Sequence, residues 1–135
     1  MKTLDILFIE DDIIEVMKLK RTIKPLYLNH KIIEVTNGED ALNLLSTIDK
    51  LPDIILMDLN MPKISGIEFL SLLRANKLFN QIPTIVLTTS GNTSDILKCY
   101  NLGISGYLTK PLKYEEYVIK INNIISYWSM NEFLE

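Results

Sequence analysis

The sequence predicts an α/β domain built on a doubly wound parallel sheet of five strands, in the order 2-1-3-4-5. Two observations predict this fold class. Short apolar runs alternate strictly with segments of helical periodicity, and this alternation is typical of a parallel sheet covered by helices on both faces. Polar residues follow four of the five apolar runs, at the strand ends where ligands gather in such sheets.

The elements are expected in the following order along the chain. Strands are expected near residues 4–9, 31–35, 53–57, 83–88 and 106–109, and helices near 12–24, 38–49, 65–76, 92–101 and 113–130. Pro52 and Pro83 precede the third and fourth strands, Asn37 and Ser65 precede the second and third helices, and Gly103 follows the fourth helix as a cap residue. The last helix is the most clearly amphipathic, so its apolar face is expected to cover the sheet.

Length and composition indicate one domain over residues 1–135, because a chain of this size buries enough surface for a core. The segment 126–135 is expected to extend the last helix. Its apolar residues, such as Met130 and Phe133, favour either plain cover of the core or a surface for a partner or a second copy.

Charge and residue counts exclude several classes of function. A net charge of -3 without a basic stripe argues against nucleic-acid binding. The absence of a long apolar run or a leader pattern predicts a cytoplasmic protein that does not enter a membrane. Cys99 is the one cysteine and is expected on a core-packed helix, and His30 is the one histidine and is expected to be a solvated loop residue.

Acidic, hydroxyl and amine side chains meet at one edge of the predicted sheet. Glu10 and Asp11 follow the first strand, Asp58 the third, Thr88 ends the fourth, and Lys110 follows the fifth. Carboxylates placed so close repel one another unless a cation joins them. Mg²⁺ suits this oxygen-rich set, with Asp11 and Asp58 as direct ligands, whereas zinc lacks its usual nitrogen and sulfur ligands.

A carboxylate beside Mg²⁺ can attack phosphorus, which would make Asp58 an aspartyl phosphate. Lys110 and Thr88 could then donate to the phosphoryl oxygens. The alternative without chemistry is that Asp11 and Asp12 cap the first helix while Lys110 pairs with an acid. Four matched strand ends favour the chemical interpretation, although Asp12 alone fits a cap.

Four runs then resemble the signature of two-component response regulator receiver domains, a flavodoxin-like (βα)5 fold, over nearly the whole chain. They are Phe8-Ile9-Glu10-Asp11-Asp12, Met57-Asp58-Leu59-Asn60-Met61-Pro62 with Gly66, Leu87-Thr88-Thr89-Ser90, and Gly106-Tyr107-Leu108-Thr109-Lys110-Pro111. The late Ser126-Tyr127-Trp128 and other short runs look most like the small regulators that partner phytochrome-type histidine kinases.

The resemblance implies that Asp58 accepts a phosphoryl group from a histidine kinase or phosphotransfer protein. It implies that Asp11, Asp58 and the main-chain carbonyl of Asn60 hold Mg²⁺, with Glu10 acting through water. Such a protein is not an enzyme in the usual sense, although it assists its own phosphorylation and dephosphorylation.

The same resemblance implies a switch in which Thr88 moves towards the phosphate and Tyr107 turns inward, changing the face formed by the fourth helix, fifth strand and fifth helix. The implied partner is a downstream protein that binds this face. A homodimer formed through this face or through the last helix is also implied. Plain core packing of Tyr107 is the alternative. The resemblance also implies a cis Lys110-Pro111 peptide bond, and Thr89 departs from it because the family mostly has a smaller residue there.

Three other functions remain as competing interpretations. A non-switching interaction module would keep the fold, but the intact acids, Thr88 and Lys110 argue against it. A phosphatase of the haloacid dehalogenase type would need a second acid two residues after Asp58, where this chain has Asn60. A flavodoxin-like cofactor protein would need small and hydroxyl residues after the first strand, where the acids of this chain repel phosphate.

Overall fold

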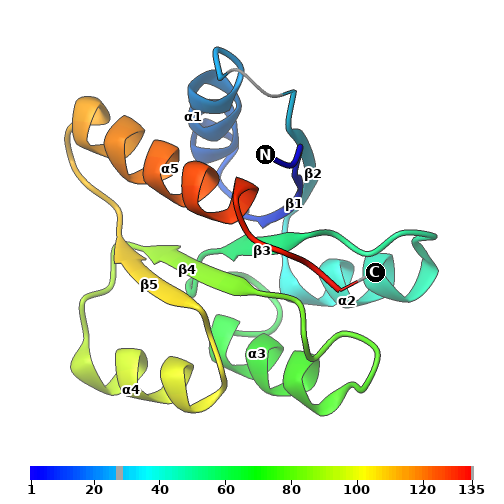
Figure 1. The fold of residues 1–135 in the computed structure, drawn as a ribbon. Helices are drawn as coiled ribbons and strands as arrows, with labels where there is room; N and C mark the ends of the chain where they lie inside the picture. Colours follow the sequence, from blue (N-terminus) through cyan, green and yellow to red (C-terminus); the bar gives the residue numbers. More distant parts are fainter. Residues whose placement is uncertain (27–28, 135) are drawn as a thin grey trace.

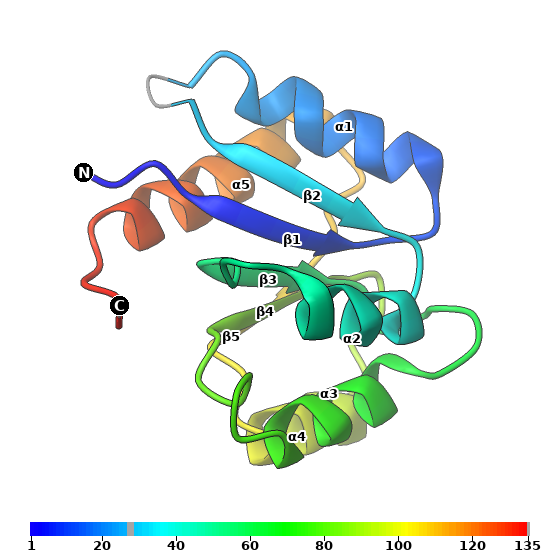
Figure 2. The same cartoon turned by 90° about the vertical axis from the view of Figure 1, so that its right-hand side faces the viewer.

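The computed structural model describes residues 1–26 and 29–134. A five-stranded parallel sheet lies in the middle of the molecule, between two layers of helices (Figures 1 and 2). The strands are β1 (Asp5–Ile9), β2 (Lys31–Val35), β3 (Ile54–Met57), β4 (Thr84–Thr88) and β5 (Gly106–Thr109). The helices are α1 (Ile13–Ile23), α2 (Gly38–Thr47), α3 (Gly66–Ala75), α4 (Thr93–Asn101) and α5 (Tyr114–Ser129).

The strand order is β2-β1-β3-β4-β5, and every neighbouring pair is parallel. This confirms the predicted fold class and strand order. Each expected element is present, and its bounds differ from the expected ones by at most two residues. The central strands β1, β3 and β4 are buried along almost their whole length because helices cover both of their faces.

Alternate residues of each strand belong to two separate apolar cores. In β1, Leu7 and Ile9 pack with α2 and α3 side chains, whereas Ile6 and Phe8 pack with those of α1 and α5. The same alternation continues through β3 and β4, since successive side chains of a strand point to opposite faces. Figure 1 shows the result, with α1 and α5 above the sheet and the other three helices below it.

Polar side chains begin four of the five helices. Asp12 accepts from the Ile14 amide, Asn37 from that of Asp40, Ser65 from that of Glu68, and Asn92 from those of Ser94 and Asp95. Gly103 has a φ of 77° just after α4, a left-handed position that a residue with a Cβ adopts at a cost. The predicted cap roles of Asn37, Ser65 and Gly103 are therefore confirmed.

The last helix and the residues after it close one end of the molecule. Helix α5 ends at Ser129, and residues 131–134 continue without regular structure. The ring of Phe133 lies 6.3 Å from that of Trp128, and the Ser129 carbonyl accepts from the Lys2 amide at 2.8 Å. Residue 135, the end of the expected extension, lies outside the described residues.

The one cysteine and the one histidine of the chain both pack against other parts of the fold. Cys99 is fully buried on α4, as expected. His30 lies in the loop before β2, as expected, but it is half-buried rather than solvated, and its Nδ1 accepts a hydrogen bond from the Leu4 amide at 2.9 Å. Burial lowers the pKa of His30 below its ordinary value, so the neutral ring that can accept this bond is the favoured form.

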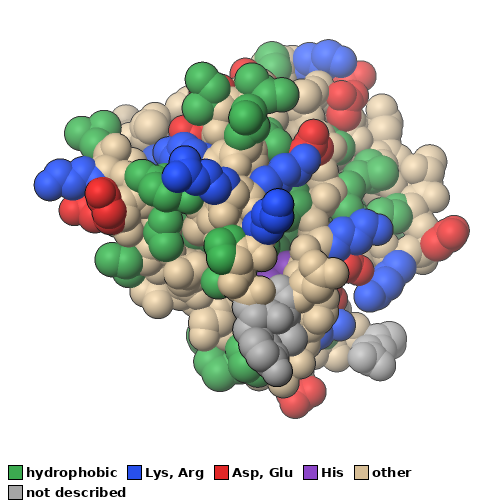
Figure 3. Space-filling model, turned by 90° about the horizontal axis from the view of Figure 1, so that it is seen from above, with side chains coloured by type: hydrophobic (Ala, Val, Ile, Leu, Met, Phe, Trp, Pro, Cys, Tyr) green, Lys and Arg blue, Asp and Glu red, His purple; other side chains and the backbone are tan. Residues whose placement is uncertain are grey.

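The surface in Figure 3 carries charges of both signs. On the face that Figure 3 shows, Lys and Arg side chains are interspersed with acidic and apolar ones. Over residues 1–26 and 29–134, no helix has the length and apolar character needed to cross a membrane.

Candidate functional site

The predicted site residues follow the strands at one edge of the sheet. Glu10 follows β1, Asp58 follows β3, Thr88 ends β4 and Lys110 follows β5. Main-chain hydrogen bonds continue one step past the strands: the Asp58 amide donates to the Ile9 carbonyl at 3.2 Å, and the Lys110 amide donates to that of Thr88 at 2.7 Å. The neighbouring strand therefore fixes the backbone from which each functional side chain projects.

Lys110 joins the two buried acids of the site. Its Nζ donates to Glu10 Oε1 at 2.7 Å and to Asp58 Oδ2 at 3.2 Å. The side chain of Lys110 is 8% exposed and that of Glu10 is 2% exposed. The ammonium is thus largely removed from water and is held by charge-assisted hydrogen bonds.

Burial and charge act in opposite directions on this pair. Burial raises the pKa of Glu10, and the hydrogen bond and charge of Lys110 offset part of that rise. Burial alone would lower the pKa of Lys110, but the hydrogen bond with Glu10 and the nearby carboxylates outweigh it, so the pKa lies above its ordinary value. Lys110 therefore remains an ammonium, able to bind a further anion.

The loop after β3 positions the acceptor carboxylate. Asp58 Oδ1 accepts from the Asn60 amide at 3.3 Å, which leaves Oδ2 to Lys110. Further along, the Gly66 amide donates to the Leu59 carbonyl at 3.0 Å, and a Cβ on Gly66 would lie only 2.7 Å from the Leu59 Cα. Lys63 has a φ of 70°, so this loop also contains a strained backbone position.

The remaining acids, Asp11 and Asp12, and Asn60 are exposed to solvent. Asp11 is exposed, and no described residue forms a hydrogen bond or an ion pair with its carboxylate. Asp12 caps α1, with its Oδ1 accepting from the Ile14 amide at 2.9 Å, as the cap interpretation predicted. The Asn60 side chain is exposed.

This donor set fits a hard divalent cation. All of its donors are oxygens, and the structure brings two of its carboxylates, on Glu10 and Asp58, together at the Lys110 ammonium. Within the described part of the chain, no three acidic, histidine or cysteine side chains form a group that could hold a metal by themselves. Mg²⁺ needs no such group, because it keeps several waters and takes one or two carboxylates.

Thr88 and Tyr107 lie beside the loop that joins β4 to α4. Thr88 is fully buried, and its Oγ1 accepts from the Ser90 amide at 3.4 Å. The Tyr107 hydroxyl donates to the Ser90 carbonyl at 2.7 Å, and burial is the main cause of its raised pKa. Thr89 is exposed, so the departure from the family pattern adds a side chain at the surface of the site.

One expectation about Lys110 is wrong. The described residues contain no cis peptide bond, so Lys110-Pro111 is trans. The trans form is the more stable one for a bond to proline by about 0.5–1 kcal/mol. Lys110 still reaches Glu10 and Asp58 from this backbone.

Sequence reasoning missed two members of the site. The Ser90 carbonyl accepts from Tyr107, and no sequence signal marks a main-chain acceptor of this kind. Glu15 Oε2 lies 3.9 Å from Lys110 Nζ. Its signal was available, because Glu15 follows the cap residue Asp12 by three positions and so lies in the first turn of α1.

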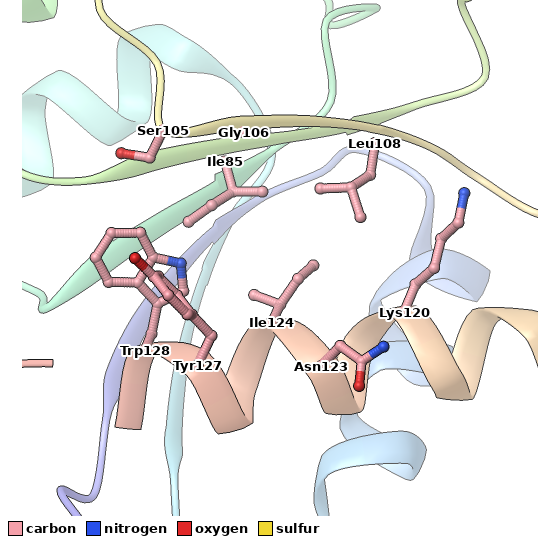
Figure 4. Close-up of a pocket in the computed structure, with 9 residues that line it drawn as sticks. All are labelled: Ile85, Ser105, Gly106, Leu108, Lys120, Asn123, Ile124, Tyr127 and Trp128. Carbon is pink, nitrogen blue, oxygen red and sulfur yellow. The ribbon is translucent and has the colours of Figure 1, made fainter. Parts of the chain in front are cut away.

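A separate groove lies along the edge of the sheet, away from the acids. It has a volume of about 580 Å³ and lies between β5 and α5, with Leu108, Ile124 and Trp128 among its lining residues (Figure 4). Lys120 at one end donates from Nζ to the Thr109 carbonyl at 2.8 Å. None of the predicted site residues lines this groove.

Comparisons with known proteins agree with this geometry. The model of the response regulator receiver domain family matches residues 6–122. The chain is 32% identical over 127 residues to a probable methanogenesis regulatory protein, FilR2, of Methanothrix harundinacea, covering 91% of this chain and 82% of the relative. It is 31% identical over 128 residues to the response regulator Rcp1 of Synechocystis, covering 91% and 87%.

Solved structures agree as well. The phosphorylated cyanobacterial phytochrome response regulator RcpA superposes with a TM-score of 0.91 at 27% identity, covering 98% of each chain. The Mn²⁺-bound form of Rcp1 superposes with a TM-score of 0.88 at 30% identity, covering 98% of this chain and 99% of that one. Proteins of this family are signalling proteins rather than enzymes in the usual sense, and response regulators of this type interact with histidine kinases. The chain belongs to the response regulator receiver domain family.

Proposed function

We propose that this protein is a phosphorylation switch in which Asp58 accepts a phosphoryl group from a histidine kinase or a phosphotransfer protein. The observation that carries the proposal is the position of Lys110, whose Nζ lies within hydrogen-bonding distance of both Glu10 and Asp58. A buried ammonium beside an acceptor carboxylate is placed to bind the charge that arrives with a phosphoryl group.

In the proposed reaction, an Asp58 oxygen forms a bond to phosphorus as the bond from phosphorus to the donor nitrogen breaks. Lys110 pairs with one phosphoryl oxygen. The Thr88 hydroxyl donates a hydrogen bond to a second phosphoryl oxygen. Its proton is available for this, because Thr88 Oγ1 is the acceptor in its hydrogen bond with the Ser90 amide. Mg²⁺, held by Asp11, Asp58 and the Asn60 carbonyl with Glu10 acting through water, would neutralise the incoming charge.

The proposed output is a change in the α4-β5-α5 face. Thr88 accepts from the Ser90 amide and Tyr107 donates to the Ser90 carbonyl, so a movement of Thr88 towards phosphate would disturb the acceptor of the Tyr107 hydrogen bond. Leu97 and Tyr100 on α4 and Tyr127 on α5 are at least half exposed. This face would bind a downstream protein or a second copy of the chain.

A donor protein must approach Asp58 from the open side of the site. On α1, which begins just after Asp11 and Asp12, three apolar side chains are exposed: Ile13 by 70%, Ile14 by 65% and Met17 by 63%. Leu112, two residues after Lys110, is also fully exposed. We propose that these four residues, the α1 apolar patch, form the contact surface for the phosphodonor protein.

Incubation with a small phosphodonor and Mg²⁺, followed by intact-mass measurement, tests the function. One phosphoryl group should be gained by the wild-type protein and none by Asp58→Asn. An unchanged wild-type mass, or an equal gain in Asp58→Asn, would reject the proposal.

A further inference from the structure

Glu15, in the first turn of α1, is a third carboxylate beside Lys110. Its Oε2 lies 3.9 Å from Lys110 Nζ, which is close enough for an ion pair and too far for a hydrogen bond. This oxygen is buried and accepts no hydrogen bond in the described part of the chain. Removing a carboxylate oxygen from water without a hydrogen bond is costly, so its orientation requires an explanation.

The start of α1 shows why Glu15 does not cap the helix. Asp12 and Glu15 have the spacing of a capping box, in which the later acid reaches back to the main-chain amide of the cap residue. Here the Asp12 amide donates to Glu10 Oε2 at 3.3 Å instead. Glu10 thus takes the bond that would have held Glu15, and Glu15 turns towards Lys110.

The other oxygen of Glu15 is held from the opposite side. Lys18 Nζ lies 3.5 Å from Glu15 Oε1, and the same ammonium lies 4.4 Å from the centroid of the Tyr117 ring on α5. Tyr117 is fully buried between the two helices. The carboxylate of Glu15 therefore lies between a lysine that packs on α5 and the lysine of the site.

We propose that Glu15 is a positioning residue for Lys110, which keeps the ammonium in the site while Glu10 and Asp58 exchange it for other partners. The inference rests on the proposed function. In that function, Asp58 becomes an acyl phosphate, and Glu10 and Asp58 both take part in the Mg²⁺ site, Glu10 through water. Among the described residues, three carboxylates lie within 4.0 Å of Lys110 Nζ, and of these Glu15 takes no part in the proposed chemistry.

The substitution Glu15→Gln keeps the length of the side chain and removes its charge. Without the charge of Glu15, the Lys110 ammonium would move closer to Asp58. The stronger contact would make the Asp58 carboxylate a poorer nucleophile. At saturating Mg²⁺ and small phosphodonor, the phosphorylation rate should fall by about five- to tenfold, the size expected for the loss of one charged contact. In a Lys110→Gln background, Glu15→Gln should cause no further slowing, because the residue acts through Lys110.

Two matched variants separate this role from general effects. Glu116→Gln makes the same change in net charge at an exposed position of α5, and its rate should equal that of the wild type. Lys18→Gln removes the ammonium beside the other oxygen of Glu15 but leaves the charge of Glu15 in place, so it should slow the reaction less than Glu15→Gln does.

A second readout needs neither phosphodonor nor metal. The side-chain ammonium signal of Lys110 in ¹⁵N NMR should shift or broaden in Glu15→Gln and stay unchanged in Glu116→Gln. The inference is overturned if this signal does not change, or if Glu15→Gln reacts within twofold of the wild type or no more slowly than Glu116→Gln. A wild-type protein that gains no phosphoryl group at Asp58 would instead reject the proposed function, and the ammonium signal would still decide whether Glu15 holds Lys110.

Discussion

The hydroxyl of Tyr107 donates a hydrogen bond to the main-chain carbonyl of Ser90, 2.7 Å away, and so ties β5 to the loop that follows β4. The same loop begins at Thr88, whose hydroxyl oxygen accepts from the Ser90 amide. Ser90 therefore contacts both proposed switch residues through its backbone. A change at Thr88 can reach Tyr107 through one residue, with no long chain of contacts.

Tyr107→Phe should loosen this connection. The ring stays in place, but the Ser90 carbonyl loses its partner, so the free energy of unfolding should fall by about 1 kcal/mol. Hydrogen exchange at the amides of residues 90–92 should become faster, while phosphorylation of Asp58 continues. Mass-spectrometric hydrogen exchange measures this directly, and unchanged exchange in this loop would contradict the coupling.

Gly66→Ala should destabilise the protein although alanine favours helices. The new Cβ would lie 2.7 Å from the Leu59 Cα, so the backbone next to Asp58 must move. A loss of about 1–3 kcal/mol in urea unfolding is expected from such overpacking, with slower phosphorylation at Asp58. Gly91→Ala is the matched control, because a Cβ there meets no atom within 4 Å and should be tolerated.

Most of the fold could be predicted because the sequence is locally consistent. Apolar runs such as Ile54 to Met57 are too short for most helices and too apolar for a strand with one exposed face. Cap residues such as Asn37 and Ser65 then mark where helices begin. The strand order was predicted from the four strands that end in candidate site residues, since the order 2-1-3-4-5 brings these four ends together. That prediction therefore used a signal of function as well as signals of folding.

The rest depends on contacts between distant residues. His30 accepts a hydrogen bond from the Leu4 amide, and Tyr107 donates one to the Ser90 carbonyl. Both partners are main-chain groups, which almost any residue type provides, so the sequence does not mark them. The sequence does not mark Glu15, because an acid at its position usually accepts a hydrogen bond from the main-chain amide of the cap residue. The structure shows that the Asp12 amide donates to Glu10 instead. The roles of Asp58 and the metal residues stay predictions.

Arg74 should contribute strongly to stability, although no acidic side chain in residues 1–26 and 29–134 forms an ion pair with it. Its guanidinium donates to the carbonyls of Leu102, Asn80 and Ile82 and to the Thr84 hydroxyl, at 2.8 to 3.3 Å. Arg74→Met should lower the free energy of unfolding by about 2–3 kcal/mol, because these acceptors lose their donor.

Arg74→Lys should restore little of this loss, since a single ammonium cannot replace the planar fork of donors. The exposed Lys98→Met on α4 should change the stability by no more than about 0.5 kcal/mol. Urea unfolding of the three variants makes the comparison, and a stable Arg74→Met would contradict it.

His30 should make stability depend on pH. Because burial lowers its pKa in the folded state, the unfolded chain takes up a proton first as the pH falls. The contribution of His30 is therefore complete above an ordinary histidine pKa of about 6.5 and is lost as the pH falls from there towards the lower folded pKa. In His30→Gln, whose side-chain oxygen can still accept from Leu4, this part of the pH dependence should vanish. Urea midpoints at a series of pH values provide the test, and equal slopes for both proteins between pH 7 and 5 would refute it.

The α1 apolar patch should matter for a protein donor and not for a small one. Met17→Gln keeps the volume and helix propensity of an exposed residue while making it polar. The rate of phosphotransfer from a histidine-phosphorylated protein that phosphorylates the wild type should fall by about tenfold, or about 1.4 kcal/mol. The rate with a small phosphodonor should not change, because Met17 is an exposed residue and the ion pairs of Lys110 with Glu10 and Asp58 stay in place. Leu78→Gln, equally apolar and 77% exposed but between α3 and β4, should leave both rates unchanged. If Leu78→Gln slowed protein phosphotransfer as much as Met17→Gln did, contact would not be confined to the α1 side of the site.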